Sequence, residues 1–323
     1  AGREPKVILE LIGDEMVPVI VEDTAEAAVY VNGHFAGAVD YKHSLIFLAD
    51  SAVPGEKFTI LLEAYAGHGP REWRCGPTPP NRVTVPEPPE KQCKVGISHF
   101  GLWNELAFQL AMDVETLYNL RESLDQDSLR VLEIDEGLKD FTIIADFETP
   151  PAVMKASLQK TRERLQPLLK KKNGDTTPEM VAFGHAHLDV AWLWPMAETE
   201  RKCVRTFSSQ LALMNRCPEY RFLQSQPQLY QMVKDHYPNL YQQILQAVQR
   251  GQWIPEGATW VEPDTNITGG ESLIRQLIHG KRFYQEEFGV DCQLLWLPDV
   301  FGFSGALPQI MRGCGGRFFS TQK

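Results

Sequence analysis

Short apolar runs separated by turn residues dominate the first 95 positions of the chain. Five runs have the length of strands: 7–12, 17–21, 28–31, 45–48 and 58–65. Asn32-Gly33 directly follows the third run and is the strongest short signal for a β-hairpin. We therefore predict that residues 1–95 form a β-rich region, part of a β-sandwich, which is more typical of a structural neighbour than of a carbohydrate-binding surface.

Helical periodicity replaces the strand pattern after a proline-rich connector at 76–89. Leucine and valine recur every three or four positions between 102 and 124, which predicts one helix. A second helix is predicted over 152–172. The segment 141–147 between them is interpreted as either strand or loop. Residues 96–177 are thus expected to form a helical linker between two domains.

Apolar strand-like runs and helical patterns alternate from residue 178 to the end of the sequence. The apolar runs lie at 180–186, 220–224, 253–261, 294–297 and 317–320. Helices are predicted at 197–215, 227–234, 240–250, 271–288 and 307–314. This alternation is typical of a parallel sheet or a β/α barrel, so the chain belongs to the α/β class. Residues 178–323 are expected to be the first part of a (β/α) barrel that forms a catalytic domain.

The stretch from 180 to 198 combines an apolar opening with polar residues at every second position: His185, His187 and Asp189. If the strand extends this far, these three side chains point to the same side. Two imidazoles and a carboxylate are ligands that suit a zinc-like divalent ion. The aromatic faces of Trp192 and Trp194 follow, and they could stack on an apolar or sugar ring.

Carboxylates follow two later strand-like runs, because Asp264 comes after 253–261 and Asp299 after 294–297. In α/β folds the catalytic groups gather at the carboxyl ends of the strands. Paired carboxylates are what glycosidic cleavage requires, one acting at the sugar carbon and the other protonating the leaving oxygen. Taken singly, each aspartate is also typical of a helix cap or a turn.

Other interpretations of the same residues remain open at this point. The two histidines could simply be hydrogen-bonded into a core at a strand end. The His-x-His pattern also occurs in metal-dependent amide hydrolases. These normally use further histidines or a lysine at later strand ends, and no histidine or lysine stands at a later strand end here before Lys323. A third hypothesis is a carbohydrate-binding or scaffold protein without catalysis. A tightly held metal ion would favour an enzyme over this third hypothesis.

Composition narrows the classes of partner. The formal net charge of −10 argues against nucleic acid and anionic membrane, and the only basic run is Lys170-Lys171-Lys172. The six cysteines form no CxxC pair, which favours a reduced, cytoplasmic protein. No apolar window approaches the length of a membrane span. Homo-oligomers are compatible with the sequence, which does not specify the oligomeric state.

Three spaced motifs carry a resemblance to a known family. They are His185-Ala186-His187-Leu188-Asp189, then Trp260-Val261-Glu262-Pro263-Asp264, then Pro298-Asp299-Val300-Phe301-Gly302-Phe303-Ser304. In this order they resemble the α-mannosidases of glycoside hydrolase family 38, and most of all their cytosolic and bacterial branch. The resemblance is specific over 178–323 and only general before that.

The resemblance implies a retaining exo-α-mannosidase that removes terminal α-linked mannose from oligosaccharides with the help of one zinc, or cobalt in some members. It implies that His187, Asp189 and Asp264 are metal ligands and that Asp264 is also the nucleophile. Asp299 would be the general acid and base, and Trp192 would stack on the sugar. His185 would orient its neighbours.

The sequence also departs from the family pattern. The family completes its metal site with a histidine from a downstream His-Asp motif, and none follows Asp299 here. We therefore expect the chain to be an N-terminal fragment of a longer enzyme. The 323 residues alone are expected to bind metal weakly and to show little turnover.

Overall fold

The computed structural model describes residues 6–13, 26–40, 43, 45–49, 54–65, 95–172, 178–192 and 194–322. The described chain is a mixed α/β protein that divides into two compact units. One unit consists mainly of residues 101–180, and the other contains most of the N-terminal strands together with residues 181–323. The predicted strand at 17–21 and the proline-rich connector at 76–89 lie outside the described residues.

The N-terminal strands form two three-stranded sheets. The first has the order β3-β2-β5 and the second β4-β1-β6. Their bounds are β1 Lys6–Gly13, β2 Glu26–Val31, β3 His34–Val39, β4 Leu45–Ala49, β5 Ile60–Tyr65 and β6 Val95–Trp103. Asn32 and Gly33 join β2 to β3 with φ values of 51° and 82°, the paired positive angles of a tight hairpin turn, so the predicted hairpin is confirmed.

A small apolar core contains residues of β2, β3 and β4. Ala27, Val29 and Val31 of β2 are buried with Val39 of β3 and Ile46 of β4. These three residues of β2 stand at alternate positions and therefore share one face of the strand, although Ala28 between them is buried as well. The strands predicted near 7–12, 28–31, 45–48 and 58–65 are confirmed, while β6 was not predicted. The packing of two sheets as a sandwich stays a prediction.

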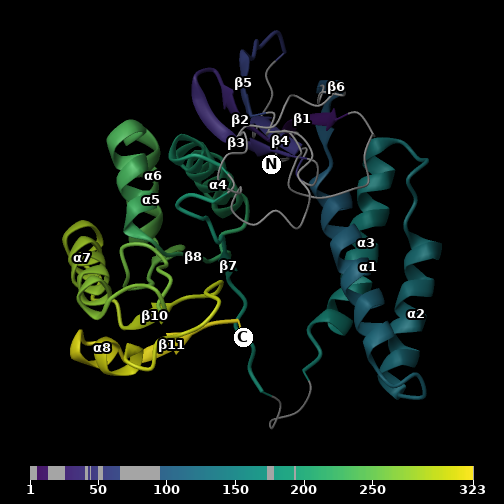
Figure 1. Cartoon of the computed structure of the whole chain (residues 1–323). Helices are drawn as coiled ribbons and strands as arrows, with labels where there is room; N and C mark the ends of the chain where they lie inside the picture. Colours follow the sequence, from purple (N-terminus) through teal and green to yellow (C-terminus); the bar gives the residue numbers. More distant parts are fainter. Residues whose placement is uncertain are drawn as a thin grey trace, which may run out of the picture. The chain divides into compact units, whose positions relative to one another are not determined.

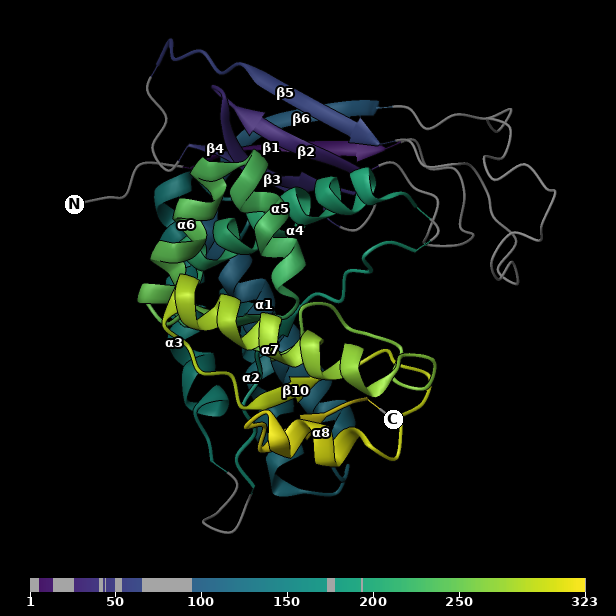
Figure 2. The ribbon, with the colours of Figure 1, turned by 60° about the vertical axis from the view of Figure 1, so that its left-hand side comes forward.

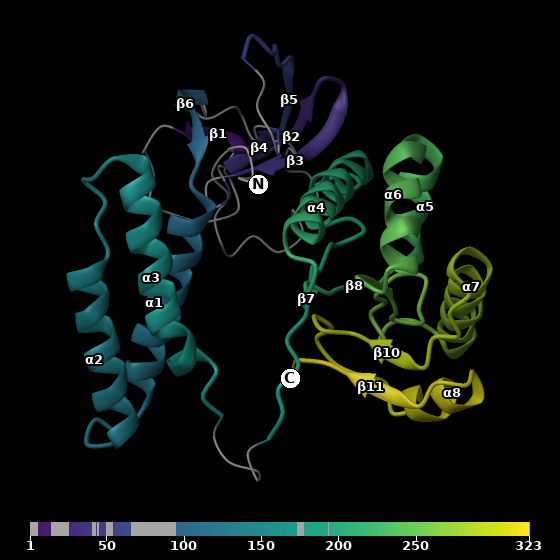
Figure 3. The same ribbon diagram turned by 180° about the vertical axis from the view of Figure 1, so that it is seen from behind.

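The first unit is a bundle of three helices, drawn side by side in Figure 3. They are α1 Glu105–Ser123, α2 Leu129–Ile144 and α3 Pro151–Leu169. Asn104 and Ser128 cap α1 and α2, because their side chains accept hydrogen bonds from the first-turn amides of Ala107 and Val131. The interpretation of 141–147 as strand or loop was wrong for its first part, because α2 continues to Ile144.

The second unit continues with short parallel strands and longer helices (Figure 1). The strands are β7 Gly184–His185, β8 Phe222–Gln224, β9 Trp253–Pro255, β10 Leu294–Trp296 and β11 Phe318–Ser320. The helices are α4 Met196–Arg216, α5 Pro227–His236, α6 Pro238–Gln249, α7 Gly270–Phe288 and α8 Leu307–Gly313. Strands β7-β8-β9 and β10-β11 form two parallel sheets, joined by a single parallel bridge between Gly257 and Leu295. This agrees with the predicted α/β class, and closure into a barrel stays a prediction.

An aromatic core lies between these strands and helices. Phe207, Tyr230, Trp253 and Tyr284 are among its fully buried side chains. The Tyr230 hydroxyl accepts a hydrogen bond from the Trp253 indole and donates one to the carbonyl of Gln224. Both polar groups are therefore satisfied inside the core, which removes the cost of burying them. Among the described helices none is both long enough and apolar enough to cross a membrane.

Helix α7 packs directly on the backbone of 258–260 and lies beside α8 (Figure 2). A Cβ atom on Gly280 would lie 2.1 Å from the Ala258 carbonyl oxygen and 2.7 Å from the Thr259 carbonyl carbon. The Gln276 side chain and carbonyl also accept hydrogen bonds from the amides of Val261 and Trp260. The chain segment after β9 is thereby fixed to α7.

We predict that Gly280→Ala lowers the free energy of unfolding by about 1–3 kcal/mol, because backbone atoms cannot move aside as a flexible side chain would. This range is a net effect, because it already subtracts the stabilisation of about 1 kcal/mol that the higher helix propensity of alanine contributes. Gly313→Ala in α8 is the matched control, since a Cβ there meets nothing within 4 Å. Urea unfolding measures both, and equal stability of the two variants would contradict the packing described.

Candidate functional site

His185 stands at the end of β7 and links three neighbouring strands. Its Nδ1 lies 3.0 Å from the carbonyl oxygen of Leu223 in β8, and its Nε2 lies 3.0 Å from the indole nitrogen of Trp296 in β10. An indole can only donate, so Nε2 accepts and Nδ1 carries the proton. Burial lowers the pKa of His185, which keeps the ring neutral. These two hydrogen bonds tie the end of β7 to β8 and β10, and the orienting role that the resemblance implies for His185 stays a prediction.

His187 lies among three carboxylates that come from different segments. Its Nδ1 is 3.0 Å from Oε2 of Glu262, and its Nε2 is 3.3 Å from Oδ1 of Asp189 and 3.8 Å from Oδ2 of Asp299. Asp189 first, and then Glu262, raise the pKa of His187 to about 10. The structure thus brings together three of the residues singled out from the sequence, and it adds Glu262.

The conformation before His187 differs from the predicted one. Only Gly184 and His185 pair with β8, whereas Val181 and Phe183 are 82% and 44% exposed. The prediction of a buried strand over 180–186 was therefore wrong for its first half. His187 and Asp189 still meet, because the loop after β7 turns both side chains toward each other.

Glu262 is the residue of this group that sequence reasoning missed. Its side chain is only 3% exposed, and Oε1 accepts a hydrogen bond from the Ser225 hydroxyl at 3.0 Å. Its backbone amide donates to the Gln226 side chain at 3.1 Å. Because both its side chain and its backbone are held by hydrogen bonds, Glu262 can fix the ring of His187. Its place two residues before Asp264, at a strand end, was the available signal.

Asp264 has an exposed side chain that caps a turn. Its Oδ1 accepts hydrogen bonds from the amides of Asn266 at 2.8 Å and Ile267 at 3.0 Å. Among the ion pairs of the described residues, none joins Asp264 to His187. Its role as nucleophile and metal ligand stays a prediction. The neighbouring Thr265 is buried and bonds to the carbonyl of Gly302 at 3.0 Å, which ties this turn to the loop after Asp299.

The two remaining residues of the prediction are accessible to solvent. The Asp299 side chain is 41% exposed and follows β10 directly. Trp192 is 53% exposed, and its ring meets that of Trp194 edge to face at 5.4 Å. The aromatic face of Trp192 and the carboxylate of Asp299 are therefore accessible to a ligand, as protein groups that contact a substrate must be.

The donor chemistry of this site fits a divalent ion, although the side chains are not set out as a finished metal site. Both ring nitrogens of His187 and Oε2 of Glu262 are buried without a well-directed hydrogen bond. A cation bound at Nε2 would satisfy that ring nitrogen. Within the ranges that the structure describes, no group of three or more His, Cys, Asp or Glu side chains has the arrangement of a metal site.

The geometry predicts that His185 stays neutral, with its proton on Nδ1, at pH values where an ordinary histidine of pKa 6.5 is half charged. The unfolded chain binds this proton near pH 6.5 and the folded chain only at lower pH, so this histidine makes folding less favourable as the pH falls through 6.5. Nitrogen NMR of histidine-labelled protein measures both the tautomer and the pKa.

Trp296→Phe is the companion variant, because it removes the indole donor while keeping an aromatic ring. We expect the pKa of His185 to rise toward its ordinary value in this variant. A wild-type His185 that titrates above pH 6.5 would contradict the assignment.

Comparison with known proteins places the α/β part of the chain in a family. Residues 177–323 match the model of the glycosyl hydrolases family 38 N-terminal domain. Alpha-mannosidase 2C1 of Homo sapiens is 37% identical over 241 residues, which cover 75% of this chain and 23% of the human protein. An alpha-mannosidase of Saccharomyces cerevisiae is 47% identical over 142 residues, which cover 44% of this chain and 13% of the yeast protein.

Among solved structures, an alpha-mannosidase from Enterococcus faecalis is 25% identical, with a TM-score of 0.40 over 43% of this chain and 16% of that protein. The chain spans less than a quarter of the length of the human and yeast relatives.

Proposed function

Because residues 177–323 belong to the glycosyl hydrolases family 38 N-terminal domain family, we propose that the whole protein is a metal-dependent, retaining exo-α-mannosidase. Its substrates are oligosaccharides that end in α-linked mannose. The matched relatives from human and yeast are named alpha-mannosidases, which supports this substrate class. The observation that carries the proposal is the meeting of His187 with Asp189, Glu262 and Asp299 at the strand ends.

The carboxylates have distinct tasks in this proposal. Cleavage of a mannoside passes through an oxocarbenium-like state, so one carboxylate must approach the sugar carbon and another must protonate the leaving oxygen. We assign the first task to Asp264 and the second to Asp299. Asp264 lies in a turn whose amides already orient one of its oxygens, and the exposure of both carboxylates leaves them accessible to substrate.

One divalent ion, zinc or cobalt, is assigned to His187, Asp189 and Asp264. When bound, such an ion supplies positive charge that holds sugar hydroxyls and polarises the reacting centre. Glu262 orients the ring of His187 through its contact with Nδ1, so that Nε2 faces Asp189 and Asp299. Trp192 offers an exposed ring face on which the terminal sugar can stack.

A reduced, cytoplasmic location is part of the same proposal. The described cysteines, Cys203, Cys217, Cys292 and Cys314, are all free thiols. Free cysteines are typical of reducing compartments. The net charge of −10 also favours a neutral glycan over nucleic acid or an anionic membrane as partner.

Release of mannose from an aryl α-mannoside by the whole protein tests the activity and its metal dependence. We expect hydrolysis that a chelator abolishes and that zinc or cobalt restores. Proton NMR of the first product should show α-mannose, because retention through a covalent intermediate keeps the configuration. Chelator-resistant hydrolysis would contradict the metal, and β-mannose as first product would contradict retention.

Asp264→Asn and Asp299→Asn test the two carboxylates in the same assay. Each variant should lower kcat by about 10²–10⁴-fold, since an amide can neither attack the sugar carbon nor donate a carboxyl proton. Asp291→Asn is the control, because Asp291 is a 65% exposed carboxylate that pairs with Lys281 on the surface. If either active-site variant keeps the activity of the Asp291 control, the role assigned to that aspartate is wrong.

A further inference from the structure

The loop that carries Asp189 is fastened to the first turn of α4 by one buried hydroxyl. Thr199 is 0% exposed. Its Oγ1 donates a hydrogen bond to the backbone carbonyl of Asp189 at 3.0 Å and accepts one from the indole nitrogen of Trp194 at 3.0 Å. A threonine hydroxyl has a single proton to donate, so the bond to Asp189 uses its whole donor capacity. Thr199 therefore connects both ends of the segment 189–194.

This use of a threonine in a helix is unusual. A buried helical threonine commonly bonds to the carbonyl four residues earlier in its own helix, as Thr161 does with Ser157 in α3 at 2.8 Å. Thr199 instead directs its hydroxyl away from α4, to a loop ten residues earlier. A valine has nearly the same shape as a threonine, so core packing alone does not require the hydroxyl at this position.

Lys202 extends the connection to the N-terminal sheet. Its Nζ lies 4.6 Å from the centre of the Trp194 ring, within the range of a cation–π contact, and 2.6 Å from Oε1 of Glu26. Glu26 is the first residue of β2. One ammonium group thus contacts both the indole that Thr199 holds and a carboxylate of the small β-sheet.

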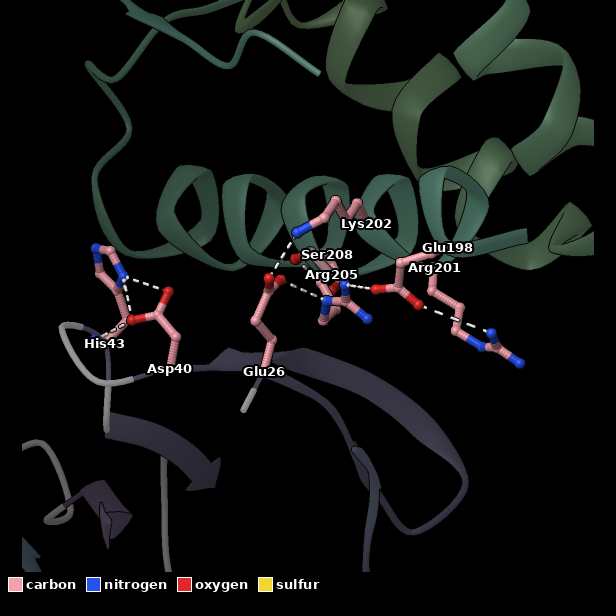
Figure 4. A network of polar contacts seen from close by, with 8 residues as sticks. All are labelled: Glu26, Asp40, His43, Glu198, Arg201, Lys202, Arg205 and Ser208. Carbon is pink, nitrogen blue, oxygen red and sulfur yellow. Dashed lines mark hydrogen bonds and ion pairs between the residues drawn. The ribbon is translucent and has the colours of Figure 1, made fainter. Parts of the chain in front are cut away.

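A buried ionic network holds this part of α4 against β2 (Figure 4). The second oxygen of Glu26 lies 2.9 Å from Nε of Arg205, and the guanidinium of Arg205 also pairs with Glu198. The Arg205 and Glu198 side chains are 5% and 0% exposed. Charges buried this deeply are stable only when paired, so Glu26, Arg205 and Glu198 fix the rotation of the first turns of α4.

We propose that Thr199 is a positioning residue for Asp189, and that Lys202 and Glu26 keep it in place from the N-terminal sheet. This inference rests on the proposed function, in which the carboxylate of Asp189 helps to hold the metal ion. Fixing the carbonyl of Asp189 fixes the plane of the peptide bond that follows it, which restricts the backbone torsion ψ of Asp189 and with it the direction of the side chain. The N-terminal sheet then contributes to the active site without touching the substrate.

Thr199→Val and Thr199→Ser test the hydroxyl, with Thr161→Val as the matched control. Valine keeps the shape and removes both hydrogen bonds, whereas serine keeps the hydroxyl. Thr161 is equally buried and loses one hydrogen bond in the control. Hydrogen exchange of the amides of 189–192 and thermal stability are measured on the chain as it stands. Cobalt affinity, from its visible absorption, and activity toward an aryl α-mannoside are measured in the whole protein.

In Thr199→Val we expect faster exchange at 189–192, about tenfold weaker cobalt binding and a lower kcat, since supports of metal ligands typically contribute this much. Thr199→Ser should restore all three quantities. Thr161→Val should lower only thermal stability. Lys202→Met, which removes the charge, should speed exchange at 189–192 as Thr199→Val does.

If Thr199→Val changes only thermal stability, as the Thr161 control does, the residue is merely structural and the proposal is wrong. Failure of the proposed function gives a different result. In that case the wild type binds no cobalt and the whole protein releases no mannose, while faster exchange at 189–192 in Thr199→Val still supports the positioning of this loop. Unchanged exchange overturns it.

Discussion

The close approach of two backbone segments at Gly257 joins the two parallel sheets of the α/β unit. Gly257 has a φ of 137°, and a Cβ there would lie 2.7 Å from the Cβ of Ser225. The same residue forms the bridge to Leu295 and accepts a long hydrogen bond from the amide of Trp296. Because the strands are short, this contact decides how the end of β10 lies beside the segment after β9. The meeting of Asp299, Glu262 and His187 depends on it.

Some features of the site and of the fold follow from the local sequence. The strand-end rule correctly predicted that His187, Asp189 and Asp299 lie near one another, because parallel strands bring their carboxyl ends to one edge whatever the details of pairing. The helices over 196–216 and 270–288 were predictable for a similar reason, since their apolar positions recur with the helical period.

Other features depend on tertiary contacts that a pattern cannot show. Glu262 is a carboxylate at a nearly buried position, and only the positions of Ser225 and Gln226 reveal why it is tolerated there. Helix α2 was missed, and in the structure it packs against α1 and α3, a tertiary contact that local sequence does not show. Val181 is exposed although its side chain is apolar, because only Gly184 and His185 of this segment pair with β8.

The ion pairs between β2 and α4 help to explain why a small sheet stays associated with a large α/β region. The apolar core of the sheet has few members. If β2 moved away, Arg205 would keep its pair with Glu198 but lose Glu26, and Lys202 would lose the same carboxylate, so the loss of these pairs is a penalty. Such a penalty specifies one arrangement more strongly than it adds net stability.

The three-helix bundle has a core of its own, formed by Leu110, Leu117, Ile134, Leu158 and Leu165. None of these residues belongs to the aromatic core of the α/β unit. Substitutions in the two cores have no shared neighbours, and their free-energy effects therefore add. Substitutions in the interior of the bundle can therefore accumulate without altering the core of the α/β unit, so the two parts of the gene are free to diverge at different rates.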